Sequence, residues 1–347
     1  MLEKGWNEQT PEPTTPDLAV NLADPDLFTH FYPADRVSSS LLPVHQLRLV
    51  IINDVQDPNF ERFRGYLDDE FGEMGGLEPR QVMVDFLTRP PDFSHDGIYT
   101  SYQLIGLTTP EGDVVAVRDH HYTLDPETRR CVVYLAHGWV HPDWRGRAVA
   151  PYLRGLPVQG AHKFAHLRGG YDELLVVAEM DPVVPSYPPS VVRMLSYSRG
   201  GFSAIPPHIL PYNLPDFRDL PPDPDLRCTI PQVLMVRRVG REDQTSLPLV
   251  LAQSALRHLY SVHLSHATCR DLPAAAEYSQ HRIRNRSEEE IPLIRATRHS
   301  ILDILPLCTS QFFPAFERCW WGREFRPGPE ELEREQLLQT WSKPIGA

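Results

Sequence analysis

The stretch Gly138–Tyr152 reads Gly-Trp-Val-His-Pro-Asp-Trp-Arg-Gly-Arg-Ala-Val-Ala-Pro-Tyr and follows directly on the apolar run Val132–Leu135. The apolar run predicts a buried strand, and the residues after the turn are typical of a helix. A strand that stops at Val140 and an Arg/Gly turn that opens a helix together form an anion site. The backbone N–H groups of the turn and the positive end of the helix dipole face the same point. A pyrophosphate suits such a turn, and Arg145 and Arg147 add positive charge.

The six residues Arg145–Ala150 resemble the acyl-CoA signature of the GNAT superfamily of N-acyltransferases. That signature reads Arg/Gln-x-x-Gly-x-Gly/Ala after a strand that ends Val-x-Pro, and such a motif gains weight from its structural context. The family's central glycine is Ala148 here. We expect this alanine at the start of the helix, where alanine is well tolerated. If it crowds the approach of the phosphates, the affinity for CoA falls.

The resemblance implies acetyl-CoA as the acyl donor. In the family, the turn holds the pyrophosphate, and the preceding strand pairs with the pantetheine amides and offers a backbone N–H to the thioester carbonyl. The cofactor-binding residues expected here are Trp139, Val140, Arg145, Gly146, Arg147, Ala148, Val149, Ala150 and Ser190.

The order of the predicted elements agrees with the GNAT fold independently of the signature. Before the turn, periodicity predicts a strand at His45–Asn53, helices at Pro58–Phe71 and Pro79–Leu87, and antiparallel strands at Tyr102–Thr108, Val114–Tyr122 and Cys131–Val140. After the turn it predicts a helix at Val149–Leu167, a strand at Glu173–Glu179, a helix at Val191–Tyr197 with Ser190 as N-cap, and a strand at Gln232–Val239. The predicted fold class is therefore α/β, with a mixed, mostly antiparallel central sheet flanked by helices.

Three segments are expected in the domain organisation. Residues 1–44 are rich in Pro and Asp and predict an arm that wraps the surface or stays mobile. Residues 46–240 carry the GNAT-like domain, and residues 241–347 an α-helical extension. The extension's predicted helices are Leu247–His266, Ala274–Arg284, Ile291–Leu305 and Glu330–Trp341. Within the domain, Pro157 predicts a kink or break of its helix near Gly155–Pro157.

The catalytic expectations begin with Tyr197. The segment from Tyr197 to Phe202 resembles the family's Tyr-x-x-x-Gly-Phe, whose tyrosine protonates the departing CoA thiolate. The expected proton acceptor is His137, near the end of the central strand, since histidine changes charge near neutral pH. Other candidates for this base are His120, His121 and Glu179.

Two further groups have alternative readings. Arg154 and Arg168 lie within reach of the 3′-phosphate of CoA, but a solvated helix face is the preferred interpretation. His263, His266 and Cys269 fall at helical spacing, with His258 before them, and such residues can bind zinc. The spacing matches no strong zinc pattern, so no metal is expected.

Composition excludes several classes of protein. The formal net charge of −12 argues against a nucleic-acid-binding protein or a polybasic membrane protein. No apolar run approaches 18 residues, so no transmembrane helix is expected. The N-terminal residues have no hydrophobic signal region, and five scattered cysteines fit reduced thiols in the cytoplasm.

The sequence thus predicts an enzyme that transfers an acetyl group from acetyl-CoA to a small-molecule amine by direct attack in a ternary complex. The C-terminal helices are one expected surface through which two copies of the chain could form a homodimer. Two alternatives stay open: a non-catalytic CoA-binding or scaffold protein with this fold, and an acyltransferase whose donor is bound to a carrier protein.

Overall fold

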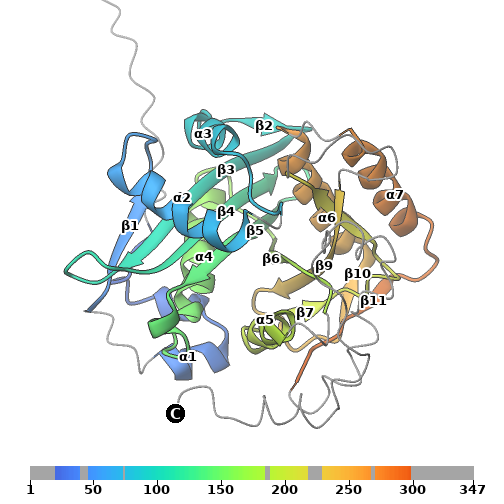
Figure 1. Ribbon diagram of the computed structural model, residues 1–347. Coiled ribbons are helices and arrows are strands. Elements are labelled where there is room, and N and C mark those ends of the chain that lie inside the picture. Colours follow the sequence, from blue (N-terminus) through green and yellow to red (C-terminus); the bar gives the residue numbers. More distant parts are fainter. Residues whose placement is uncertain are drawn as a thin grey trace, which may run out of the picture.

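A computed structural model of the chain describes residues 20–39, 46–72, 75–183, 188–217, 229–266 and 270–297 (Figure 1). Its strands are β1 Arg48–Ile52, β2 Ser94–His95, β3 Ile98–Thr108, β4 Val114–Asp125, β5 Arg130–Val140, β6 Glu173–Met180, β7 Ser203–Ala204, β8 Tyr212–Pro215, β9 Thr229–Arg238, β10 Ser246–Pro248 and β11 Glu290–Pro292. Its α-helices are α1 Pro33–Ser39, α2 Pro58–Phe71, α3 Arg80–Thr88, α4 Ala150–His166, α5 Pro188–Arg199, α6 Leu249–Leu264 and α7 Leu272–Arg284, and short 3-10 helices span Leu27–His30 and Pro142–Trp144.

The central sheet has the strand order β1-β3-β4-β5-β6-β9-β7. Every neighbouring pair in this order is antiparallel except β5 and β6, which run parallel and are joined through α4. The predicted class, α/β with a mixed and mostly antiparallel central sheet flanked by helices, is therefore confirmed. The helix at Pro58–Phe71 has the predicted bounds, and its N-cap Asp57 accepts a hydrogen bond from the Asn59 amide at 2.8 Å.

Helices cover both faces of the sheet. Neighbouring residues on one strand pack into different clusters, since side chains alternate between the faces. Leu104 packs with the buried side chains of α2, whereas Ile105 packs with those of α4. Helices α3 and α6 pack on the same face of the sheet as α2. The ring of Phe86 in α3 lies edge-on to His121, and Nδ1 of His258 in α6 lies 2.7 Å from the Thr123 hydroxyl. The extension is thus part of the main core in its described portion (Figure 1).

The described part of the N-terminal segment is anchored on α4, as opposed to wrapping loosely. Leu27 and Phe31 are fully buried. Phe31 fits against Gly155, where a Cβ would lie 1.9 Å from the ring. The carboxylate of Asp35 accepts hydrogen bonds from the Arg154 guanidinium at 2.7 to 3.1 Å.

Of the kink or break expected at Pro157, the break does not occur, because α4 is continuous from Ala150 to His166. Proline removes one backbone hydrogen bond from a helix, but tertiary packing supplies most helix stability in proteins. The residues on both sides of Pro157 are fully buried. At Gly160 the helix also comes close to the sheet, since a Cβ there would lie 2.0 Å from the Tyr122 hydroxyl.

Other boundaries differ from the sequence-based predictions. Ser190 is not an N-cap, because α5 begins at Pro188 and Ser190 lies inside it, fully buried. The helix expected from Ile291 is wrong in its described part, since Glu290–Pro292 is a strand that pairs with β10. The predicted helix Glu330–Trp341 lies outside the described residues. No described helix is both long and apolar enough to span a bilayer.

Candidate active site

The central feature of the site is the point where β5 and β6 stop pairing. The two strands are in register from Arg130 and Glu173 to Leu135 and Ala178. Beyond that point β5 continues to Val140 beside β4 alone, while β6 continues beside β9. The backbone of Ala136–Val140 therefore has an edge without a strand partner, which is what an extended ligand with amide groups needs.

A bulge in β5 accompanies this separation. Arg118 pairs with Gly138 and His120 with Leu135, so two residues of β5 face the single residue Asp119 of β4. A bulge bends its strand and turns side chains in new directions. Here it turns the backbone N–H of His137 toward Asp119 Oδ1, at 2.7 Å.

The Arg/Gly turn joins the end of β5 to α4. Gly146 and Ala148 both have left-handed backbone conformations, with φ of 77° and 60°. The helix begins at Ala150, its N-cap Val149 makes no side-chain capping bond, and its first turn holds no acidic residue. An uncapped helix N-terminus beside a turn of this kind favours a bound anion. The turn is exposed before Ala148, at Gly146 and Arg147, whereas Val149 after it is buried.

The two arginines of the turn have local contacts. Arg145 donates from Nε to the Val140 carbonyl at 3.0 Å, and its Nη2 lies 3.9 Å from Glu70. The guanidinium of Arg147 lies 5.5 Å from the ring centroid of Trp144. Both side chains are at the surface beside the turn, so they add positive charge there without being buried.

Trp139 and Val140 are on β5 just before the turn. Trp139 is buried on the α2 side, where its ring stacks on Tyr66 at 4.3 Å. Its side chain is therefore a core contact, and a cofactor would meet the backbone of this segment.

The expectation that Ala148 lies at the start of the helix is wrong. Ala148 precedes α4, and its backbone is left-handed. This conformation costs a non-glycine residue about 1 kcal/mol or more. Replacing Ala148 with glycine is therefore expected to raise the free energy of unfolding by about 1 kcal/mol, measured by urea denaturation. The matched control is Ala150→Gly in the first helical turn, expected to lower it by about 0.5–1 kcal/mol. Equal destabilisation by both changes would contradict the strain at Ala148.

Tyr197 lies in α5 on the sheet face opposite α2, in contact with Arg118. The Arg118 Nη2 is 3.5 Å from the Tyr197 hydroxyl, and the tyrosine ring packs edge-on against Phe202 at 5.1 Å. Arg118 lies directly over Gly138, where a Cβ would be 2.3 Å from its Nη2. Tyr197 is thereby held beside the segment of β5 that has no β6 partner.

The surroundings of Tyr197 favour proton donation. Burial alone would raise the pKa of its hydroxyl, but the positive charge and hydrogen bond of Arg118 lower the pKa overall, with Arg154 and Arg193 adding to this. Arg118 is itself buried, and its Nε and Nη1 have no hydrogen-bond partner among the described residues. Arg118 is not among the functional residues expected from the sequence.

His137 does not fit the role of general base. Its Nδ1 lies 3.1 Å from both carboxylate oxygens of Asp119, and its Nε2 lies 2.9 Å from the carbonyl oxygen of Gly76. Burial lowers the pKa of this imidazole, but Asp119, with a contribution from Glu78, raises it to about 10. Both nitrogens then donate, so His137 is a buried cation with no lone pair left to accept a proton.

The other candidate bases are also engaged or buried. His120 Nε2 lies 2.7 Å from the Tyr122 hydroxyl, and burial lowers the pKa of this histidine to about 3. Burial lowers the pKa of His121 as well. Glu179 accepts hydrogen bonds from Tyr134 and Tyr212, and its Oε1 lies 3.1 Å from His263 Nε2. None of these groups is a free base beside Tyr197.

Arg154 and Arg168 are not solvated helix residues. Arg154 forms the buried ion pair with Asp35, and Arg168 donates to the backbone carbonyls of Phe164 and Pro91. Both guanidinium groups are therefore engaged within the fold and are not free to contact a 3′-phosphate at the Arg/Gly turn.

The histidines with helical spacing in α6 have separate environments. His258 bonds to Thr123, and Cys269 lies outside the described residues. His263 and His266 instead lie near Glu78, in the segment between α2 and α3. No signal in the sequence linked Glu78 to these histidines. For Asp119 a signal existed: four consecutive polar residues, Arg118–His121, interrupt an otherwise apolar strand.

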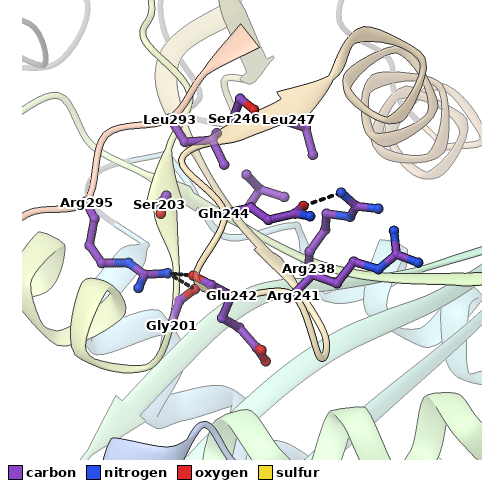
Figure 2. Close-up of a pocket in the computed structure, with 11 residues that line it drawn as sticks. Gly201, Ser203, Arg238, Arg241, Glu242, Gln244, Ser246, Leu247, Leu293 and Arg295 are labelled. Carbon is purple, nitrogen blue, oxygen red and sulfur yellow. Dashed lines mark hydrogen bonds between the residues drawn. The ribbon is translucent and has the colours of Figure 1, made fainter. Parts of the chain in front are cut away.

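A separate hollow lies at the C-terminal end of β9 and is lined by the residues drawn in Figure 2. Its arginines are held by contacts within the fold. Arg238 pairs with Glu173 at 2.7 Å and donates to Gln244, and Arg295 donates to the backbone carbonyls of Gly201 and Glu242. The hollow is lined by other elements than the Arg/Gly turn.

No protein-family model matches this sequence, and no curated protein matches it. Among solved structures, the chain is similar to a GNAT-family acetyltransferase from Staphylococcus aureus Mu50, with 13% identity and a TM-score of 0.32 over 56% of this chain and 100% of that one. It is also similar to spermidine N-acetyltransferase from Vibrio cholerae in complex with CoA and spermine, with 10% identity and a TM-score of 0.31 over 58% and 99% of the two chains. The fold assignment rests on this chain's own strand order and register.

Proposed function

We propose that this chain is an acyl-CoA-dependent N-acyltransferase that transfers an acetyl group to a small-molecule amine. The proposal rests on two features that lie next to each other in β5. The strand loses its parallel partner after Leu135, and five residues later it ends in a turn before an uncapped helix N-terminus. The unpaired edge suits the amides of pantetheine, and the turn suits a pyrophosphate.

In the proposed reaction, the neutral amine attacks the thioester carbonyl carbon of the bound donor. A bond forms between the amine nitrogen and this carbon, the carbon–sulfur bond breaks, and the amine loses its proton to solvent water. Tyr197 gives its proton to the departing thiolate, and Arg118 stabilises the phenolate that remains. No covalent intermediate with the protein is required, because donor and acceptor are held together.

A non-catalytic CoA-binding protein is the second candidate. It is favoured by the environment of His137, which leaves that residue without the lone pair of a general base. The two candidates agree on CoA binding and differ on turnover.

Acetyl-CoA binding is tested by calorimetric titration of the purified protein. The variant Arg145→Glu is expected to bind acetyl-CoA at least about 10-fold more weakly, since it places a negative charge beside the pyrophosphate and removes a charged donor. Arg284→Glu, on the exposed surface of α7, makes the same change of charge far from the turn and is expected to bind like the wild type. An equal loss in both variants, or no binding by the wild type, would contradict the proposed cofactor site.

Turnover is then measured as thiol release from acetyl-CoA with a panel of small amines. Release that depends on an amine supports the enzyme, whereas binding without release for every amine supports the second candidate.

A further inference from the structure

Three buried polar atoms that have no hydrogen-bond partner among the described residues lie between the segment before α3 and the end of α6. They are Glu78 Oε2, His263 Nδ1 and His266 Nε2. The three residues offer ligand atoms that lie within 4.8 Å of one another. An unpaired polar atom in a protein interior is costly, so several together require a partner.

The other nitrogen of each histidine is already held. His263 Nε2 lies 3.1 Å from Glu179 Oε1 and 3.0 Å from the Tyr212 hydroxyl, and His266 Nδ1 lies 2.9 Å from the Val262 carbonyl oxygen. A histidine that donates one ring N–H to a carboxylate or a backbone carbonyl presents the lone pair of its other nitrogen. This is the usual arrangement around a metal-ligating histidine.

We propose that Glu78, His263 and His266 form a binding site for a divalent transition metal ion of the zinc class. Two imidazoles and one carboxylate are a ligand set that zinc uses, with a water molecule or another oxygen in the fourth position. Zinc ligand atoms lie about 2.1 Å from the ion and hence roughly 3.4 Å apart, so side-chain movements of about an ångström close the site. The aromatic ring of Phe86 lies edge-on to His266 at 4.6 Å and limits how that imidazole can turn.

A second cluster nearby, Glu78 with Asp119 and His137, does not share this property. Both nitrogens of His137 are hydrogen bonded, to Asp119 and to Gly76, so His137 has no lone pair for a metal. His137 Nδ1 lies 3.8 Å from Glu78 Oε2, beyond hydrogen-bond distance. Glu78 is therefore assigned to the site with His263 and His266.

The consequence of the site is structural. Glu78 belongs to the connection between α2 and α3, and the two histidines belong to the last turn of α6 and the residues after it. An ion bound by all three would tie the helical extension to the first helical layer of the domain. The site lies on the sheet face opposite Tyr197 and does not depend on the proposed acyl transfer.

The test uses untagged full-length protein stripped of metal by a chelator. Titration with Zn²⁺ is expected to show one tight site per chain and to raise Tm, and Co²⁺ is expected to give the visible absorption of a four-coordinate site. The variants His266→Ala and Glu78→Gln are expected to weaken Zn²⁺ binding at least about 100-fold. Each removes one ligand, and Glu78→Gln keeps the shape of the side chain.

The control is His281→Ala, which removes an exposed histidine of the neighbouring helix α7. It is expected to bind Zn²⁺ like the wild type. Circular dichroism of each variant checks that it is folded. Absence of a stoichiometric site in the wild type, or tight binding kept by both ligand variants, would overturn the proposal.

Discussion

Replacing Tyr197 with phenylalanine is expected to lower kcat by about 10²–10⁴-fold while leaving the affinity for acetyl-CoA within about 2-fold. The change removes only the hydroxyl that would protonate the leaving thiolate. The ring keeps its packing against Phe202, so the fold and the cofactor site should be preserved. Thiol release under single-turnover conditions measures the chemical step, and calorimetry measures binding.

The matched control is Tyr278→Phe, which removes the hydroxyl of a tyrosine that is 55% exposed in α7. It should leave kcat unchanged. If Tyr197→Phe also retains full turnover, the tyrosine is not the acid.

Arg118 provides an independent check of the same role. Because Arg118 lowers the pKa of Tyr197, Arg118→Met is expected to raise that pKa. The wild-type kcat should fall as pH rises through the pKa of Tyr197, since the acid is then deprotonated. In Arg118→Met the alkaline limb of this profile should lie at higher pH. A loss of kcat without any shift of the limb would indicate that Arg118 acts in another way.

Asp119→Asn is expected to lower the free energy of unfolding by about 3–5 kcal/mol, because it leaves His137 as a buried cation without its partner. Asp119 is 1% exposed and His137 is 7% exposed, so water does not replace the lost carboxylate. Urea denaturation at pH 7 measures the effect. The control is Asp172→Asn, which breaks an exposed ion pair with Arg129 and should cost at most about 1 kcal/mol.

The same pair predicts the pH dependence of stability. The pKa of His137 is raised from its ordinary value of 6.5 to about 10 in the folded protein. The folded state therefore holds this proton more tightly than the unfolded state does. Its contribution is complete below pH 6.5 and is lost as pH rises toward about 10.

The free energy of unfolding of the wild type should accordingly fall between pH 7 and pH 10, and it should fall less steeply in Asp119→Asn. Identical slopes in the two proteins would show that His137 is not the titrating group.

The elements that build the sheet could be predicted because their patterns are local. The helix at Pro58–Phe71 begins with Asp-Pro and buries Phe60, Phe63 and Leu67 at helical spacing, and its bounds were predicted correctly. The predicted strands differ from the observed ones only at their ends, because pairing with a neighbouring strand sets the length of a strand. The short strands β2, β7, β8, β10 and β11 were missed because they contain few residues and exist only through their partners.

Some residues of the candidate site could also be predicted from local patterns, and others could not. The Arg/Gly turn and Tyr197 could be located from short motifs, whereas Arg118, Asp119 and Glu78 could not be assigned partners. Each acts on a residue far away in the chain: Arg118 on Tyr197, Asp119 on His137, and Glu78 near His263. Sequence spacing holds no information about such contacts unless the strand register is known.

Local sequence patterns were enough to predict the order of the longer strands from β1 to β9 and of the helices between them, the class of the sheet and the position of the turn before α4. Apolar periodicity and glycine content act within a few residues, so they can be seen in the chain. Only the tertiary structure decided that Ala148 is left-handed, that His137 is a paired cation and that Arg154 is buried against Asp35. Protonation and burial depend on what surrounds a side chain in three dimensions, and the fold sets these surroundings when it brings distant segments together.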